Sequence, residues 1–228
     1  MRILVIDTSC GAASVAVLDS ATRRSLASRV EPMARGHAEA LAPMTAAVIG
    51  EIEGGAASLG AIGVTVGPGS FTGIRIGLAL ARAMGLALEV PVIGVSTLVA
   101  FAAPLLAQPR AGIILSAIDA RHGAVYFQAF ENSGRPLFAP RVGPLRDAIR
   151  AIGAGPGHFV GDAAETLTVE ARRGNLECEG YPSPYPDINA VALIALAANP
   201  ATSPPRPIYV KPPDAKPATG EAIARAEG

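Results

Sequence analysis

Cysteine is scarce in this sequence of 228 residues, and neither sign of charge is in excess. The only two cysteines, Cys10 and Cys178, give neither a disulfide framework nor metal-ligand spacing, which is typical of a protein from a reducing cytoplasm. The 19 Lys and Arg residues balance 19 Asp and Glu residues. The chain as a whole therefore has no field that attracts nucleic acid, acidic substrates or a membrane surface. Any contact with RNA would need positive charge from another molecule.

Targeting and membrane segments are also missing. The N-terminal run MRILVIDTS is interrupted by Asp7 and has no small-residue cleavage site. Residues 90–109 carry no charge and reach the length of about 20 residues that a membrane span needs. Pro91 and Pro104 interrupt them, however, so they fit a buried strand followed by a helix that begins after Ser96. We expect a cytoplasmic protein without a membrane segment.

Familiar catalytic and phosphate-binding motifs are absent as well. The loop GPGSFTGIR (67–75) lacks the lysine with which a P-loop neutralises phosphates, and its glycines do not follow the GxGxxG spacing. Pro68 also removes a backbone donor from it. A serine hydrolase is not indicated either, because the sequence has no GxSxG elbow and no Ser, His and Asp that can be assigned as a set. Ser70 or Thr72 is more simply the N-cap of the following helix.

What the sequence does contain is the pattern of an α/β protein. Three apolar runs separated by short turns predict antiparallel strands at 2–7, 12–19 and 23–31. Single helices and strands then alternate, which predicts parallel pairing: helix 36–49, strand 61–67, helix 72–88 and strand 91–95. This order is that of a ribonuclease-H-like or actin-like half-domain.

A second unit follows from about residue 111. It contains predicted strands at 111–119, 124–130 and 157–162, and predicted helices at 144–152, 163–173 and 187–198. We therefore expect an actin-like fold of two lobes, 1–110 and 111–199, each a mixed sheet flanked by helices. Prolines in 200–228 predict an extended or disordered tail, of which PIYVK is the one part that could dock.

Two helices carry faces that need an explanation. Gly73, Gly77, Ala81 and Gly85 lie four residues apart on one stripe, although an interior helical glycine costs about 0.8 to 1 kcal/mol relative to alanine. Such a stripe lets another backbone approach, either that of the protein's own sheet or that of a partner helix, and both remain open. If a partner is there, Gly77→Leu or Ala81→Arg weakens association and spares the fold. The candidate interface residues are His37, Leu41, Met44, Val48, Gly73, Ile74, Gly77, Leu78, Ala81 and Gly85.

Candidates for chemistry are few. The histidines His37, His122 and His158 are isolated, and a single imidazole cannot hold a metal. Four aspartates follow predicted strands, where an actin-like fold places metal and phosphate groups, although such residues also cap turns: Asp7, Asp19, Asp119 and Asp162. We expect no catalytic residue, no metal and no cofactor in the isolated chain. A small ATP- or metal-dependent enzyme using Asp7 and Asp119 is the alternative, and a peptidase is the least favoured one.

Several segments resemble the TsaB (YeaZ) family of bacterial threonylcarbamoyladenosine synthesis proteins. They are ILVIDTSCGAASVAVLD, HAEALAPM, GPGSFTGIRIGLALARAMGLAL, VPVIGVSTL, AIDARHGAVYFQAF, VGD and YPDINAVALIALA. The resemblance covers most of residues 1–131 and weaker patches to about 210. It implies an actin-like (ASKHA) fold and a non-catalytic, dimerising and activating partner of TsaD, the tRNA threonylcarbamoyltransferase.

The resemblance also implies how such a complex is built. TsaD would form a heterodimer with this chain through the helices at 36–49 and 72–88. The ATPase TsaE completes the complex, so ATP and metal belong to the partner subunits, and tRNA is met only through the complex. A homodimer through the same helices is the alternative when the partner is absent.

Departures from TsaD-type sequences point in the same direction. Where those sequences have ETSCDET, this chain has DTSCGAA, so that residues 11–13 replace two acids and a threonine. Where they have the metal-binding NHLEGH, this chain has STLVAF, with Thr97 and Phe101 at the histidine positions. Phenylalanine has no donor atom for a metal. Aligning DARHG with the phosphate-cradling SGGHT puts Arg121 where a glycine would let phosphate approach.

Overall fold

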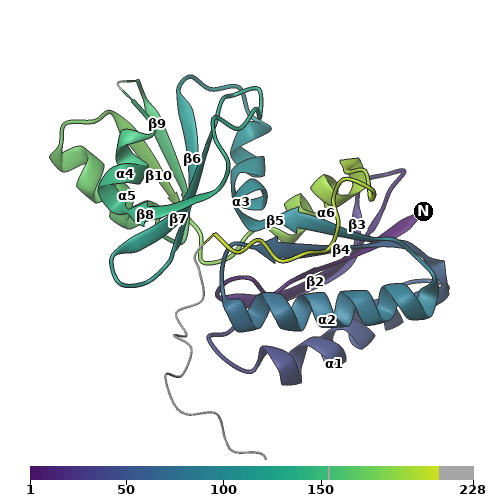
Figure 1. Cartoon of the computed structure of the whole chain (residues 1–228). Coiled ribbons are helices and arrows are strands. Elements are labelled where there is room, and N and C mark those ends of the chain that lie inside the picture. Colours follow the sequence, from purple (N-terminus) through teal and green to yellow (C-terminus); the bar gives the residue numbers. More distant parts are fainter. Residues whose placement is uncertain (154, 211–228) are drawn as a thin grey trace, which may run out of the picture.

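The computed structural model describes residues 1–153 and 155–210. These residues form two lobes, each with a five-stranded mixed sheet (Figure 1). The strand order is β3-β2-β1-β4-β5 in the first lobe and β8-β7-β6-β9-β10 in the second. In both sheets the first three strands are antiparallel and the last two run parallel to the first. One topology therefore occurs twice, and the predicted two-lobed fold is confirmed.

The elements of the first half follow the predicted order closely. They are β1 (Arg2–Asp7), β2 (Ala12–Asp19), β3 (Ser25–Pro32), α1 (His37–Gly50), the 3-10 turn η1 (Gly55–Ser58), β4 (Leu59–Gly67), α2 (Phe71–Leu88), β5 (Val92–Ser96) and α3 (Thr97–Leu106). Ser70 is the N-cap of α2, because its side chain accepts a hydrogen bond from the Gly73 amide at 3.2 Å. The uncharged run 90–109 is the predicted strand and helix rather than one long helix.

The second half contains two strands that the sequence did not reveal. Its elements are β6 (Ile113–Asp119), β7 (Ala124–Phe130), β8 (Arg141–Pro144), α4 (Leu145–Arg150), β9 (Gly157–Gly161), α5 (Ala164–Arg173), β10 (Cys178–Pro182) and α6 (Ile188–Ala197). The strands β8 and β10 were missed because they are short, contain glycine and proline, and lie at the sheet edges, where half-exposed residues show no alternation.

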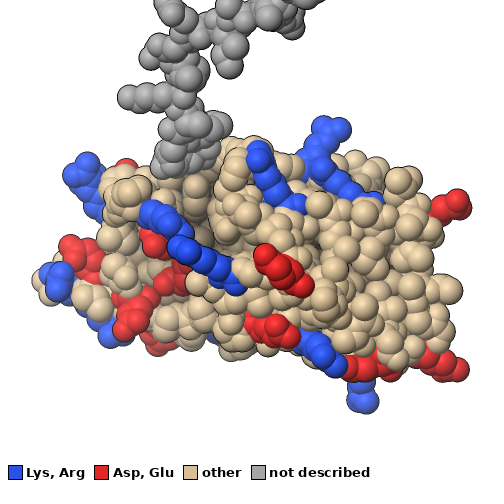
Figure 2. All heavy atoms as spheres, turned by 90° about the horizontal axis from the view of Figure 1, so that it is seen from below, with Lys and Arg blue, Asp and Glu red and all other residues tan. Residues whose placement is uncertain are grey.

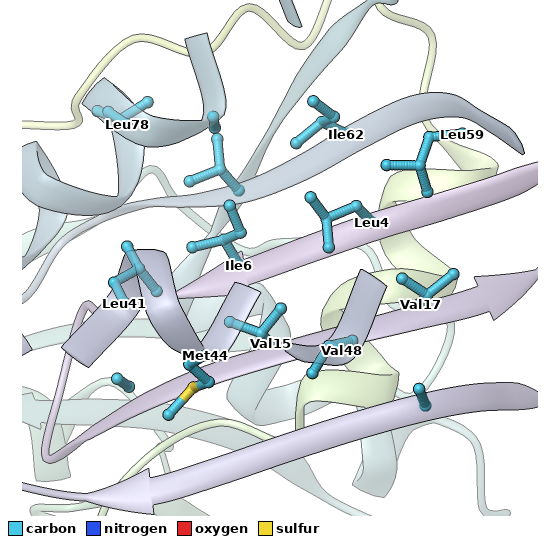
Figure 3. Close-up of a cluster of buried hydrophobic side chains, with 14 of the residues drawn as sticks. Leu4, Ile6, Val15, Val17, Leu41, Met44, Val48, Leu59, Ile62 and Leu78 are labelled. Atoms are coloured by element: carbon cyan, nitrogen blue, oxygen red, sulfur yellow. The ribbon is translucent and has the colours of Figure 1, made fainter. Parts of the chain in front are cut away.

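The first sheet is covered on one face by α1 and α2 (Figure 1). Aliphatic side chains of the two central strands meet one face of α1 there. Figure 3 shows this core, with Leu4, Ile6, Val15 and Val17 of the sheet against Leu41, Met44 and Val48 of the helix. The residues predicted to share one face of the first helix therefore do so, and that face is the buried one.

The last helix of each half packs on the sheet of the other half. Helix α6 contacts β1, β2, β4 and β5 of the first sheet, whereas α3 contacts β6, β7 and β9 of the second. A Cβ atom on Gly63 of β4 would lie 2.7 Å from the Ala195 Cβ, so glycine is what lets α6 approach this closely. The division at residue 110 therefore follows the chain but not the packing, because a helix pattern does not tell which sheet the helix covers.

The described part of the proline-rich tail is extended and docked on the first lobe. We call residues 203–210 the C-terminal strap. The Gly94 amide donates to the first carbonyl of the strap at 2.8 Å, and the Ile208 amide donates to the Val66 carbonyl at 2.8 Å. The Ile208 side chain packs against the first core. The rest of the predicted tail, 211–228, lies outside the described residues.

Helix α2 is the one helix of the described ranges that has the length and hydropathy of a membrane span. Along its length, however, one face of it is buried on the sheet, and Arg75 and Arg82 are exposed on the opposite face. It is built as a surface helix of a globular lobe.

Candidate functional site

A cleft of about 530 Å³ lies between the two lobes. This cleft results from the duplicated topology. The turn after β1 faces the turn after β6 and the residue after β9 across it, and the start of α2 closes one side. The residues that line it are Ser9, Cys10, Gly11, Met33, Ala34, His37, Gly69, Ser70, Phe71, Thr72, Ile118, Asp119, Ala120, Arg121, Tyr126 and Asp162.

Asp7, at the end of β1, is fully buried beneath this cleft rather than exposed in it. Its Oδ1 accepts hydrogen bonds from the Ser9 amide at 3.0 Å, the Ser9 hydroxyl at 2.6 Å and the Thr65 hydroxyl at 2.6 Å. Burial raises the pKa of the Asp7 carboxyl, and these hydrogen bonds oppose the rise. Asp7 thus braces the turn after β1, and its Oδ2 has no hydrogen-bond partner among the described residues.

Asp119 and Asp162 do line the cleft, from the ends of two neighbouring parallel strands. Both also bind backbone: the Asp119 amide donates to Asp162 Oδ1 at 2.7 Å, and the Arg121 amide donates to Asp119 Oδ1 at 2.8 Å. Burial, together with the charge of Asp119, raises the pKa of Asp162 to about 6. Asp19 lies elsewhere and caps the turn after β2, where Thr22 and Ala21 donate to it. Turn capping therefore accounts for Asp19, and Asp7 and Asp119 also accept from the amide two residues further on.

Cys10 is the one thiol of the cleft. Burial, and secondarily the nearby Asp7 and Asp162 carboxyls, raise the pKa of the Cys10 thiol well above its usual value. A thiol with a raised pKa stays protonated at neutral pH and is a poor nucleophile. Both cysteines are free, which agrees with the expectation that they form no disulfide framework.

No three His, Cys, Asp or Glu side chains come together as a metal site within residues 1–153 and 155–210. His37 is buried at the edge of the cleft, whereas His158 Nε2 is hydrogen-bonded to the Ala111 carbonyl at 2.8 Å on the second lobe. Thr97 and Phe101, at the positions aligned with metal-binding histidines, are 0% and 2% exposed. Phe101 packs in the core between α3 and the second sheet, so a close-packed core occupies this place.

The turn after β6 has a conformation that glycine favours, yet it holds two larger residues. Arg121 and His122 have φ values of 64° and 54°, ahead of Gly123 at 74°. Arg121 lines the cleft, as the alignment with a phosphate-cradling turn predicts. A side chain now stands where such a turn would offer bare backbone.

The glycine stripe of α2 faces the protein's own sheet. A Cβ atom on Gly73 would lie 2.0 Å from the Thr8 carbonyl oxygen, and one on Gly77 would lie 2.5 Å from Thr8 Oγ1. All ten candidate interface residues are buried within the chain. Their side chains therefore pack inside the chain, so Gly77→Leu or Ala81→Arg would damage the fold, while a partner interface at these ten residues stays a prediction. That the two helices dock a partner stays a prediction.

The opposite side of the two helices is exposed, and we call it the outer helix face. It is lined by alanines four residues apart, Ala38, Ala42 and Ala46 on α1 and Ala79, Ala83 and Ala87 on α2, with Phe71, Arg75, Arg82 and Leu86 beside them. Most of this surface, which faces the reader on the right of Figure 2, carries no charge. Sequence reasoning missed it, although the alanine spacing was a signal equal to that of the glycines.

Two lobes of one topology around a cleft define the class: this is a protein of the actin-like ATPase fold. A family model described as TsaD, tRNA N6-adenosine threonylcarbamoyltransferase, matches residues 29–156. Together with the relatives below, this match shows that the chain belongs to that family, in its TsaB (YeaZ) branch.

The relatives cover different parts of the chain. The tRNA threonylcarbamoyladenosine biosynthesis protein TsaB of Escherichia coli is 37% identical over 131 residues, which is 58% of this chain and 55% of that protein. The uncharacterized protein Rv3421c of Mycobacterium tuberculosis is 35% identical over 215 residues, 94% of each chain. The structure of YeaZ from Pseudomonas aeruginosa superposes with a TM-score of 0.73 at 27% identity, covering 91% of this chain and 99% of that one. The predicted family is thereby confirmed.

Proposed function

We propose that this chain is the non-catalytic, activating subunit of a complex that forms threonylcarbamoyladenosine in tRNA in the cytoplasm, and that it docks the TsaD transferase in a heterodimer. The outer helix face carries this proposal, because it exposes small and apolar side chains from two adjacent helices. The role in threonylcarbamoyladenosine biosynthesis is inferred from the relatives named TsaB biosynthesis protein.

The composition of the outer helix face suits a helix-to-helix contact. Alanines at four-residue spacing allow a second helix to approach closely, and Leu86, which is 83% exposed, offers a large side chain to bury. Burying apolar area contributes about 25 cal/mol per Å². Left in water, the same surface is a liability, so a homodimer through it competes when TsaD is absent.

A supporting role without catalysis agrees with how the chain uses its polar residues. Asp7 lies beneath the cleft with Oδ1 engaged by Ser9 and Thr65, and Phe101 is core. We propose that ATP and metal act on TsaD and on the TsaE ATPase, and that tRNA is met through the complex, because this chain has no net positive charge.

Reconstitution tests the proposal. Purified TsaD and TsaE, with threonylcarbamoyl-AMP and tRNA, are assayed for transfer alone, with this chain, and with its Ala79→Arg variant. We expect the wild-type chain to raise turnover at least about tenfold, and Ala79→Arg, which places a charge on the outer helix face, to remove most of the gain. Equal turnover with and without the wild-type chain would contradict the proposal.

One alternative is the small ATP- or metal-dependent enzyme for which Asp7 and Asp119 were the candidates. Because Asp7 is buried beneath the cleft, Asp162 would have to act with Asp119 in its place. Isothermal titration of the isolated chain with Mg-ATP separates the two functions. The accessory role predicts no heat of binding up to millimolar ligand, whereas saturable micromolar binding lost in Asp162→Asn would favour the enzyme. A peptidase has no support in the cleft, since Cys10 is held as a protonated thiol.

A further inference from the structure

Three residues, two from α2 and one from the C-terminal strap, form an exposed cluster at the start of α2. The Arg75 guanidinium lies 3.7 Å from the centre of the Phe71 ring, and its Nε donates to the Tyr209 hydroxyl at 3.2 Å. The two rings are 5.7 Å apart. Arg75 is thus fixed between two aromatic side chains rather than free to move.

The strap that supplies Tyr209 is firmly attached. The Ile208 side chain packs against the first core, its carbonyl oxygen lies beside Gly67, and its amide donates to the Val66 carbonyl. Upstream, Arg82 of α2 donates to the Pro205 carbonyl at 3.1 Å. The strap therefore belongs to the same surface as α2. Because Tyr209 is already held in place, binding a partner does not have to include the entropy cost of ordering it.

The cluster has the composition of a protein interface rather than of an ordinary surface. Phe71 and Tyr209 are 49% and 51% exposed, although aromatic side chains are usually covered. Aromatic residues and arginine are the types that dominate binding energy at interfaces. The cluster also continues the outer helix face, because Phe71 and Arg75 lie on the same side of α2 as Ala79.

The charge of this region is positive. Helix α2 contains Arg75 and Arg82 but no acidic residue, and the strap adds Arg206. Within the described ranges, no carboxylate lies within salt-bridge distance of these three arginines. The N-terminus of α2 adds the positive end of a helix dipole. A carboxylate is therefore the complementary group for Arg75.

We propose that Tyr209, Phe71 and Arg75 extend the outer helix face into a single docking surface, in which Arg75 receives a carboxylate of the TsaD partner. The strap is then part of the interface and not only a brace for β5. This inference rests on the proposed function and adds to it a second element, far from α1 and α2 in sequence, together with the chemistry of its contact.

Titration calorimetry of the full chain with TsaD tests the inference. We expect Tyr209→Ala to weaken binding about tenfold and Arg75→Glu about 100-fold, since the latter sets two negative charges against each other. Tyr209→Phe keeps the ring but loses the oxygen that orients Arg75, so its loss is a few-fold. Wild-type affinity falls with added salt, and Arg75→Met flattens that dependence.

Arg146→Glu on α4 is the matched control, because it reverses an exposed charge on the other lobe and is expected to bind like wild type. Melting curves check that Ile208 still anchors the strap in each variant. If the wild-type chain binds TsaD while Tyr209→Ala and Arg75→Glu bind equally well, the strap inference is overturned and the proposed function stands. If the wild-type chain does not bind TsaD, both fall.

Discussion

At the scale of single residues, the glycines of α2 mark where another part of the backbone lies close to the helix. The sequence located the stripe, but the identity of the backbone opposite it depends on contacts between residues far apart in the chain. The turn around Thr8 supplies that backbone, and its hydroxyl also donates to the Gly73 carbonyl at 2.7 Å. The stripe is therefore a feature of the core, and the side of the helix available to a partner is the other one.

Alanine at Gly77 tests this packing. Because the new Cβ would meet the fixed Thr8 hydroxyl, we expect Gly77→Ala to lower the free energy of unfolding by about 1–3 kcal/mol. Gly50, at the end of α1, has no atom of the described residues within 4 Å of an added Cβ. Gly50→Ala should therefore change the free energy of unfolding by less than about 1 kcal/mol, in the stabilising direction. Urea denaturation measures both, and equal effects at the two positions would refute the packing account.

Asp162 predicts a pH dependence of stability. Its folded pKa of about 6 lies above the ordinary 3.8, so the folded chain holds a proton that the unfolded chain has released. Its contribution to stability is complete below 3.8 and is lost as the pH rises through about 6. Asp162→Asn keeps the oxygen that accepts from Asp119 and removes the titration.

We therefore expect wild type to lose more stability than Asp162→Asn between pH 4 and pH 7, as measured by urea denaturation across that range. Asp19 provides a control of opposite sign, because hydrogen bonds from Thr22 lower its pKa and its contribution is lost as the pH falls. Parallel pH curves for wild type and Asp162→Asn would show that the Asp162 carboxyl is not perturbed.

At the scale of elements, sequence periodicity predicted the strands and helices with strong patterns. The buried run of β4 and the amphipathic helices α1 and α2 were placed within two residues of their observed bounds. The edge strands β8 and β10 were not found, since their pairing comes from neighbours already in place. The strap was predicted only in part: an extended tail in which PIYVK could dock was expected, but the hydrogen bonds to Gly94 and Val66 are made by backbone and leave no side-chain pattern.

The two faces of α2 can be separated by placing the same charge on each. Ala79 is exposed on the outer helix face, so Ala79→Arg should leave the melting temperature nearly unchanged and weaken TsaD binding at least about tenfold. Ala81 is fully buried, so Ala81→Arg should destabilise the fold by about 4 kcal/mol or more, because it buries an unpaired charge. Calorimetry and melting curves measure the pair. Undiminished binding by Ala79→Arg would exclude this face as the docking surface.

At the scale of the whole molecule, the two lobes are interlocked by their terminal helices. The first sheet is completed by α6 and the strap, which come from the end of the described chain, and the second sheet is covered by α3 from the first half. The site shows the same dependence on long-range contacts. The sequence identified the acids at the strand ends, but their burial and engagement by turns required the assembled lobes.

A chain cut after residue 110 tests the interlocking. Without α6, one face of the first sheet, including Ile3 and Val5, would be exposed to water. We expect residues 1–110 alone to show no cooperative thermal unfolding by circular dichroism, and to regain it when a peptide of residues 187–210 is added. A cooperative transition near that of the full chain would show instead that the first lobe is complete by itself.

We have proposed that this chain works by docking TsaD through a surface that its own fold leaves open. Sedimentation of equimolar mixtures of the full chain, of mass 23.1 kDa, with TsaD tests it most directly. We expect a species with the summed mass of one chain and one TsaD for wild type, and separate components for Ala79→Arg. Two independent components in the wild-type mixture at micromolar concentration would contradict it.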